Sequence, residues 1–424
     1  MKSKLKNLFH GWYVAMGCCL IYFFVNSMTL FVPQTLFPRL MEEFSVNEAE
    51  ISLTVARTLL FAAIFSPISG ILIDKYGAVK VLKVGVIIMG LTYSFYPFAT
   101  SIDTLYRLHF LMAIGLVCSG LGPNVIIVSN WFNEHRGKVV GMLVAGSSLG
   151  GATLPLLISP IVNASDWGWR WGYGILAILF WIFAVIPAYT FIRPNPQSMG
   201  LHPDGLDHEP KIENETSSGV SFIEALKSRT LWCLGIGSAC LWFSIQGLNS
   251  QITIFFEQEA GYTAQQAVIL FSTLFWFSFF GKFAFGALSD KIPKQRVFLI
   301  TSCILFIGSL LLFEINNGQL SFTQNRAQLT IFTILFGLGF GGSFSMIQLV
   351  ALEIFGKAYL GRILGLISLV DGMGAALGTK LLSELKISTG SYFVPFTLVS
   401  LVTLFAIINV FLIKPIQTKS QTMS

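Results

Sequence analysis

Long apolar runs alternate with short polar stretches along the whole chain. Twelve of these runs hold about 20 residues or more, the length that an α-helix needs to cross the hydrocarbon core of a bilayer. They cover approximately residues 11–34, 50–73, 79–99, 104–130, 139–162, 170–192, 230–255, 264–288, 296–314, 328–353, 363–386 and 391–413. The pattern predicts an all-α polytopic membrane protein with twelve transmembrane helices.

One long polar segment interrupts this spacing after the sixth run. It extends from Arg193 to about Arg229, contains four prolines and includes the mixed-charge stretch DHEPKIENETSS. Its composition predicts a loosely ordered linker with a short helix near Phe222–Lys227. The chain is therefore expected to divide into a six-helix bundle at 1–192, a cytoplasmic linker at 193–229 and a second six-helix bundle at 230–424.

Composition supports the membrane assignment. Of the 424 residues, 54% are hydrophobic and 11% are charged, and the mean hydropathy is +0.71. A soluble domain is about 25% charged, so a bilayer suits this chain better than water. All six cysteines fall inside predicted helices without metal-ligand spacing, and we expect neither a metal site nor a cofactor.

The formal net charge of +6 is explained by topology and not by nucleic-acid binding. With the N-terminus inside, nineteen of the 27 Lys and Arg residues lie on the inner side and four lie in outer loops. This positive-inside bias places both termini in the cytoplasm. The expected location is the plasma membrane, which is the inner membrane in a bacterium. The first apolar run is too long for a signal peptide and is expected to stay as the first helix.

Short motifs on the inner side recur in both halves. GILIDK at Gly70–Lys75 matches GALSDK at Gly286–Lys291, and GKVVG at Gly137–Gly141 matches GRILG at Gly361–Gly365. Two matches in the same order, after or before equivalent helices, indicate a duplicated six-helix unit. Such repeats are typical of transporters whose substrate site lies near the bilayer midplane.

These features resemble the major facilitator superfamily over essentially the whole chain. GILIDKYGAVK is similar to the superfamily's motif G-x-x-x-D-[RK]-x-G, whose charged residues cap helix ends and pair with a neighbouring inner loop, latching one state of the transport cycle. The residues assigned to this gating motif are Gly70, Asp74, Lys75 and Gly77 in the first half and Gly286, Asp290 and Lys291 in the second. The second copy of the motif has Pro293 close to the position that Gly77 occupies in the first copy. The second copy therefore matches the superfamily's motif less well at its end.

Four further stretches resemble the monocarboxylate transporter and oxalate/formate antiporter branch. They are HGWYVAMGCCLIYFF, WFNEHRGKVVGMLVAGSSLGG, GWRWGYG and RPNPQSMGLHPDG. The resemblance implies a secondary active transporter that moves a small organic anion, a monocarboxylate, by alternating access. It implies a proton or a counter-anion as the coupling partner, and a monomer in the lipid bilayer.

Two opposite charges are predicted in the middle of the bilayer. Lys282 lies eight residues before Asp290, and Asp371 lies nine residues after Arg362. At a rise of about 1.5 Å per residue, Lys282 is about 12 Å and Asp371 about 13–14 Å above the inner surface. Charges at this depth are costly and usually face a partner or a water-filled cavity. We therefore expect both residues at the substrate site.

A mechanism follows as a hypothesis. Lys282 pairs with Asp371 when the site is empty, a carboxylate substrate competes for the ammonium, and Asp371 takes up a proton with the substrate. A static ion pair that only orients two helices is the alternative. The resemblance favours a substrate role, because this branch has a basic residue at the Lys282 position of the eighth helix.

The chain departs from its branch at two positions. Monocarboxylate transporters have Arg at the Lys282 position and Asp four residues earlier, where this chain has Ser278. Oxalate/formate antiporters have a second basic residue at the Asp371 position. One cation and one anion favour a monocarboxylate or a zwitterion over a dicarboxylate.

Other polar residues within the helices have several possible roles. Gln34, Gln246, Asn249 and Gln251 are candidates for hydrogen bonds to a substrate, and aromatic residues such as Trp242 and Phe275 could line its apolar part. Arg57, Arg107 and Lys380 fall near the outer boundary, where they either reach lipid headgroups or attract anions to a vestibule. His109 is expected to pack between helices or to lie at the interface.

Other classes of protein remain as alternatives. We find no nucleophile, metal cluster or pair of carboxylates at one depth, so we do not expect an enzyme. No G-x-x-x-x-G-K-[ST] loop is present for ATP. The remaining alternatives are a transporter or exchanger of a zwitterion or larger organic molecule, such as an amino acid or siderophore, and a membrane sensor that transports nothing.

Overall fold

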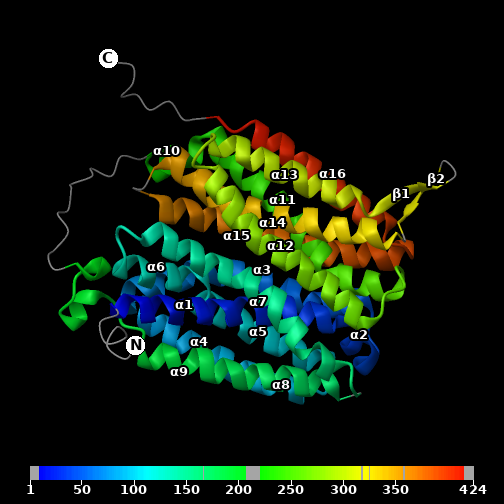
Figure 1. The fold of residues 1–424 in the computed structure, drawn as a ribbon, viewed down its shortest axis with the longest axis horizontal. Coiled ribbons are helices and arrows are strands. Elements are labelled where there is room, and N and C mark those ends of the chain that lie inside the picture. The colour runs from blue at the N-terminus through cyan, green and yellow to red at the C-terminus, as the bar shows by residue number, and fades with distance from the viewer. Residues whose placement is uncertain are drawn as a thin grey trace, which may run out of the picture. The chain divides into compact units, whose positions relative to one another are not determined.

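The computed structural model describes residues 9–165, 167–206, 220–316, 319–323, 325–356 and 359–414. Helices occupy all twelve predicted spans (Figure 1). Eleven helical segments in the described residues are long and apolar enough to cross a membrane. The ninth span corresponds to a shorter helix, α13 (Lys294–Leu310), of 17 residues. These observations confirm the prediction of an all-α polytopic membrane protein.

Contacts group the chain into two compact units. One unit contains Met1–Phe44 and Ile64–Glu213, and the other contains Ser45–Ala63 and Asn214–Ser424. The division falls inside α3 (Glu48–Tyr76), whose beginning belongs to the second unit and whose end belongs to the first. The bundle boundaries at 192 and 230 stay a prediction.

The helices before the linker include two π-helical turns. In chain order they are α1 (His10–Asn26), η2 (Ser27–Phe31, π), α2 (Val32–Phe44), α3, α4 (Ala78–Phe95), η3 (Tyr96–Phe98, 3-10), α5 (Ile102–Ser119), α6 (Leu121–Trp131), α7 (Arg136–Val162), α8 (Gly168–Phe180), η4 (Trp181–Val185, π) and α9 (Ile186–Thr190). The α1 helix packs against α7, and α4 packs against α5. Tyr173 Oη donates a hydrogen bond of 2.8 Å to the Met28 carbonyl oxygen and so stabilises η2.

The described residues of the second part of the chain form six long helices and one hairpin, besides one short helix. Its elements are α10 (Phe222–Lys227), α11 (Arg229–Gln258), α12 (Ala264–Leu288), α13, β1 (Phe313–Asn316), β2 (Gln319–Phe322), α14 (Arg326–Phe355), α15 (Leu360–Thr389) and α16 (Phe393–Phe411). The α10 helix confirms the predicted short helix, and a capping box between Ser221 and Glu224 begins it. The α11 helix packs against α15 and α16, and α14 packs against α12 and α13.

The hairpin of β1 and β2 corrects the predicted end of the ninth span. That span was expected to reach residue 314, but α13 ends at Leu310 and β1 begins at Phe313. The strands are antiparallel, with Phe313 opposite Phe322. The two rings stack with centroids 5.8 Å apart, and such cross-strand aromatic pairs stabilise a strand pairing over a longer helix.

The beginning of the linker is held against the first unit, which differs from the predicted loose order. It forms two 3-10 helices, η5 (Pro196–Met199) and η6 (Pro203–Gly205). The Asp204 carboxylate accepts hydrogen bonds of 2.8–3.3 Å from the backbone N–H groups of residues 133–135, immediately before α7. The linker residues 207–219 lie outside the described residues, so loose order stays a prediction for them.

Candidate functional site

Lys282 lies in an aromatic environment inside the second unit. The residue is on α12 and is 7% exposed, and its Nζ lies 4.6 Å from the centroid of the Phe344 ring on α14. The two helices approach closely because Gly341 on α14 faces the Ser278 carbonyl oxygen on α12, where a Cβ would have no room. A desolvated cation over an aromatic face is stabilised by about 2 kcal/mol.

Further rings continue from Phe344. Trp242 on α11 meets Phe344 edge to face at 5.7 Å between centroids and meets Phe340 at 6.0 Å. Phe340 in turn contacts Phe275 on α12 at 5.8 Å. Sequence reasoning named Trp242 and Phe275 but missed Phe344. The sequence does contain a signal for this residue, the Gly337-x-x-x-Gly341 spacing. These glycines let this part of α14 approach α12 closely.

Asp371 contacts a different helix from Lys282. Its Oδ1 accepts a hydrogen bond of 2.5 Å from Ser238 Oγ on α11. The α15 helix reaches α11 because Gly374 and Gly378 face backbone carbonyl oxygens of α11. The contacts that the structure describes place each charge beside a separate glycine-packed pair of helices, Lys282 at α12 and α14 and Asp371 at α15 and α11. The direct pair between Lys282 and Asp371 stays a hypothesis.

Sequence reasoning also missed Ser238. It lies four residues before Trp242 and eight before Gln246, so the three side chains share one face of α11. Asn249 lies on the same face, three residues beyond Gln246. This spacing was a signal in the sequence that could have connected Ser238 with the predicted amides.

Gln246 and Asn249 form a buried amide pair on α11. Both residues are 0% exposed, and Asn249 Nδ2 donates to Gln246 Oε1 across 3.5 Å. Gln246 Nε2 and Asn249 Oδ1 have no partner among the described residues. Buried polar atoms are nearly always hydrogen-bonded in folded proteins, so these two atoms suit a hydrogen bond to water or to a ligand. Gln34 on α2 is also fully buried, but it belongs to the first unit.

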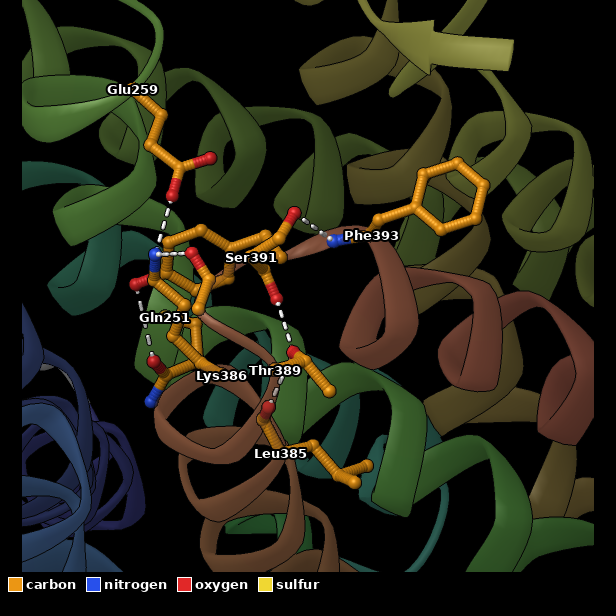
Figure 2. A network of polar contacts seen from close by, with 9 residues as sticks. Gln251, Glu259, Leu385, Lys386, Thr389, Ser391 and Phe393 are labelled. Carbon is orange, nitrogen blue, oxygen red and sulfur yellow. Dashed lines mark hydrogen bonds and ion pairs between the residues drawn. The ribbon is translucent and has the colours of Figure 1, made fainter. Parts of the chain in front are cut away.

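Gln251, by contrast, belongs to a polar network at the end of α15 (Figure 2). Its Nε2 donates to Ser52 Oγ on α3 at 2.8 Å, and its Oε1 accepts from Tyr392 Oη at 3.4 Å. In the same network, Lys386 Nζ on α15 contacts Glu259 Oε1 at 2.5 Å. These partners assign Gln251 a structural role in joining α3, α11 and the turn before α16.

The charges predicted near the outer boundary lie in varied surroundings. Lys380 is exposed and pairs with Glu384 at 3.7 Å, and Arg107 is also exposed. Arg57 is half-buried. His109 is fully buried with Nε2 3.3 Å from Tyr96 Oη, which agrees with the expected helix-packing role.

The gating motif is found at helix ends. Gly70, Asp74 and Lys75 are in the last turns of α3, and Gly77 precedes α4 with φ +86°, a backbone conformation that favours glycine. Gly286 is near the end of α12. Asp290 and Lys291 follow that helix and are exposed, as are Asp74 and Lys75. In the described ranges no ion pair is recorded for these four charges, so their latch stays a prediction.

Comparison with known proteins places these features in a family. The model of the Major Facilitator Superfamily matches residues 19–379 and again residues 234–422. The MFS transporter asaE of Aspergillus flavus is 26% identical over 338 residues, covering 78% of this chain and 69% of its own. The "Probable hexose phosphate transport protein" of Chlamydia pneumoniae is 27% identical over 391 residues, covering 86% and 82%.

A third relative comes from the branch that the sequence motifs resemble. Monocarboxylate transporter 4 of Rattus norvegicus is 22% identical over 395 residues, covering 89% of this chain and 78% of its own. The relatives share a class of activity, transport, while their names point to different substrates. The match of the family model over most of the length, together with the helical fold, shows that the chain belongs to the major facilitator superfamily.

Proposed function

We propose that this membrane transporter is a secondary active carrier of a small organic anion, a monocarboxylate, coupled to protons and working by alternating access. The observation that carries the proposal is the buried Lys282 ammonium in the aromatic environment of Phe344 and Trp242. A small carboxylate complements this site because its anionic end matches the ammonium and its short carbon chain matches the rings. Relatives named as monocarboxylate transporters support the choice.

Asp371 is the proposed proton carrier. As a carboxylate it accepts the hydrogen bond from Ser238 Oγ. A hydroxyl both donates and accepts, so Ser238 can also accept a hydrogen bond from a protonated Asp371. The pair can therefore hold either state of the carboxyl group while a substrate binds at Lys282. In this form of the mechanism the substrate binds at Lys282 while Asp371 exchanges its proton beside Ser238.

The proposal includes further partners and an orientation. Gln34, Gln246 and Asn249 contribute hydrogen bonds to the substrate, a proton or counter-anion supplies the driving force, and the chain works as a monomer. Both termini face the cytoplasm of a plasma membrane or bacterial inner membrane. Labelling of single cysteines placed at the exposed Glu134 and Gln265 tests the orientation. An impermeant thiol reagent on intact cells should react at 265 and not at 134, and the reverse pattern would contradict it.

Uptake into proteoliposomes tests the substrate class. With an inward proton gradient, labelled lactate should accumulate above the level in protein-free vesicles, and collapse of the gradient should remove the excess. If folded protein gives no excess uptake of any monocarboxylate under either condition, the proposal is wrong.

A zwitterion is the second candidate because the buried ammonium of Lys282 and the half-buried carboxyl group of Asp371 occur in the same unit. An amino acid would place its carboxylate at Lys282 and its ammonium at Asp371. Relatives named for hexose phosphate and riboflavin transport favour larger organic molecules as a further possibility. Uptake of amino acids without uptake of lactate would favour the zwitterion.

A further inference from the structure

Two cations that the proposed function does not use lie close together in the first unit. Lys83 is near the beginning of α4, and Arg193 follows the end of α9. The two helices are neighbours (Figure 1). Both residues are half-buried, and the Lys83 ammonium and the Arg193 guanidinium lie close enough to repel each other. Like charges held together are unfavourable unless an anion lies beside them.

Tyr189 on α9 connects the two cations. Its hydroxyl donates to the Lys83 carbonyl oxygen at 3.3 Å, and the centroid of its ring is 5.2 Å from Lys83 Nζ. Arg193 Nη1 donates to the carbonyl oxygens of Tyr189 and Ile192 at 3.4 and 3.2 Å. The backbone at Arg193 is held in turn, because its carbonyl oxygen accepts from Trp131 Nε1 at 3.0 Å. These contacts position both charges without neutralising them.

The two cations lack an acidic neighbour. Within the part of the chain that the structure describes, neither Lys83 nor Arg193 forms an ion pair. Another half-buried cation of the same unit, Arg170, does form one, with Glu43 at 2.9 Å. A guanidinium and an ammonium are the groups with which proteins commonly bind phosphate. The anion that suits this pair is therefore a phosphate group.

Exposed apolar side chains occur on both helices beyond the cations. Val84 and Leu91 are exposed and lie seven residues apart, so they share one face of α4. Ile182 on η4 and Ile186 on α9 are exposed as well, and Tyr189 is 47% exposed. Apolar side chains on the outside of membrane-spanning helices suit lipid acyl chains. A phosphate attached to acyl chains therefore fits this surface better than free phosphate does.

We propose that Lys83, Arg193 and Tyr189 bind the headgroup of an anionic phospholipid. The two cations donate to the phosphate oxygens, and the Tyr189 ring lies at headgroup level, where such amphipathic rings are favoured. Basic pockets between membrane helices bind anionic headgroups in this way. A zwitterionic headgroup fits less well, because it brings a third cation to the pair. The proposal does not depend on the transported substrate.

Native mass spectrometry of the full chain in a mild non-ionic detergent tests the proposal. The protein is titrated with phosphatidylglycerol or with phosphatidylcholine that carries the same acyl chains. The wild type should bind phosphatidylglycerol about 5-fold or more tightly than phosphatidylcholine. Lys83→Gln and Arg193→Gln should each lower the affinity for phosphatidylglycerol by about 5-fold and change the affinity for phosphatidylcholine little.

Two control variants connect the preference to this pair of cations. Lys294→Gln removes a cation that already contacts Glu353 at 3.5 Å, so it should leave the lipid preference unchanged. Lys83→Arg keeps the charge at the site and should keep the preference. Retention in Lys83→Arg also shows that the loss in Lys83→Gln is not a general loss of folding.

Several results would overturn the proposal. They are equal affinities of the wild type for the two lipids, a preference that survives in both glutamine variants at the site, and an equal loss in Lys294→Gln. Thermal unfolding with inorganic phosphate separates the two sources of phosphate. Phosphatidylglycerol should raise the melting temperature of the wild type, and inorganic phosphate at the same concentration should not. Equal stabilisation by both would assign the site to a soluble anion and contradict a lipid site.

Discussion

Each of the two charges, Lys282 and Asp371, has a neighbour that suits its chemistry. The Lys282 ammonium lies over the Phe344 ring, and the Asp371 carboxylate accepts from the Ser238 hydroxyl. An aromatic ring attracts a cation without neutralising it, so the ammonium can still bind an anion. A hydroxyl serves both protonation states of a carboxyl group. These neighbours suit one group that binds an anion and another that exchanges a proton.

Removal of the Asp371 charge should separate proton coupling from substrate binding. In Asp371→Asn, uptake driven by a proton gradient should fall to the level seen without a gradient, while exchange of labelled for unlabelled substrate continues. Ser238→Ala should weaken coupling less, since it removes a single hydrogen bond worth about 1–3 kcal/mol to a charged group. Proteoliposome uptake and counterflow measure the two activities.

Glu384→Gln is the control for this experiment, because Glu384 is exposed and pairs with Lys380 within α15. It should leave both activities unchanged. Loss of exchange together with coupling in Asp371→Asn would contradict a specific role in proton transfer.

The sequence gives an expected depth for these charges, which stays a prediction, but it does not give their partners. Helical rise converts residue spacing into depth, which placed Lys282 and Asp371 near the middle of the bilayer. Partners depend on how each helix is rotated and on how closely neighbours approach. Here Gly341 and Gly374 determine these properties, and their contacts lie on other helices.

At the scale of elements, glycine spacing determines the packing of the second unit. On α14, Gly337 and Gly341 face carbonyl oxygens of α12 with no room for a Cβ, whereas Gly365 on α15 has no atom within 4 Å of that position. Gly341→Ala should lower stability by about 1–3 kcal/mol through overpacking. Gly365→Ala should be neutral or slightly stabilising, because alanine favours helix.

Thermal unfolding of both purified variants in the same detergent measures this difference. Gly341→Ala should melt several degrees below the wild type and below Gly365→Ala. Equal melting temperatures for the two variants would show that the close approach of α12 and α14 does not contribute to stability.

The linker contact at Asp204 should depend on the ionisation of its carboxylate. Burial disfavours the charge, but hydrogen bonds from the backbone of Glu134 and Asn133 and from His135 outweigh it and lower the pKa of Asp204. A lowered pKa means that this contribution is present above the unfolded value of about 3.9 and is lost as the pH falls through the folded value. Asp204→Ala should therefore lower stability near pH 7 by about 1.5–3 kcal/mol.

Asp204→Asn is the conservative variant, since asparagine keeps an acceptor oxygen and tolerates the φ of +59° at this position. It should lose less stability than Asp204→Ala. Limited proteolysis of the linker reports the same contact, and both variants should be cut faster than the wild type. Unchanged cleavage and melting in Asp204→Ala would show that the contact does not hold the linker.

Helices were easier to predict than the interruptions between them. Apolar length identified all twelve spans because lipid forces each backbone polar group to pair within its own helix. The π turn η2 accepts a hydrogen bond at its Met28 carbonyl oxygen from Tyr173, which lies 145 residues away in the sequence. A local window cannot detect such a contact. The hairpin of β1 and β2 escaped prediction because its aromatic residues extend the apolar run of α13.

At the scale of the whole molecule, the duplicated unit indicated a transporter and the resemblance of GILIDKYGAVK to the superfamily's motif indicated the family, which the family model confirms. The sequence repeat divides the chain at the linker and so assigns the whole of α3 to the first half. It therefore could not predict that the beginning of α3 groups with the second unit. The hydrogen bond between Ser52 on α3 and Gln251 on α11 is one contact that creates this grouping. Substrate class depends on a few side chains, and relatives at 22–27% identity have names that point to several substrates.

The most direct measurement is the initial rate of lactate uptake into proteoliposomes under an inward proton gradient, compared between wild type, Lys282→Gln and Lys380→Gln. Loss of a buried charge that binds an anion costs about 2–5 kcal/mol, so Lys282→Gln should lower affinity by at least about 30-fold. Lys380 is exposed and pairs with Glu384, so its variant should match the wild type. Wild-type uptake that persists at full affinity in Lys282→Gln would contradict the role of Lys282 as the carboxylate site.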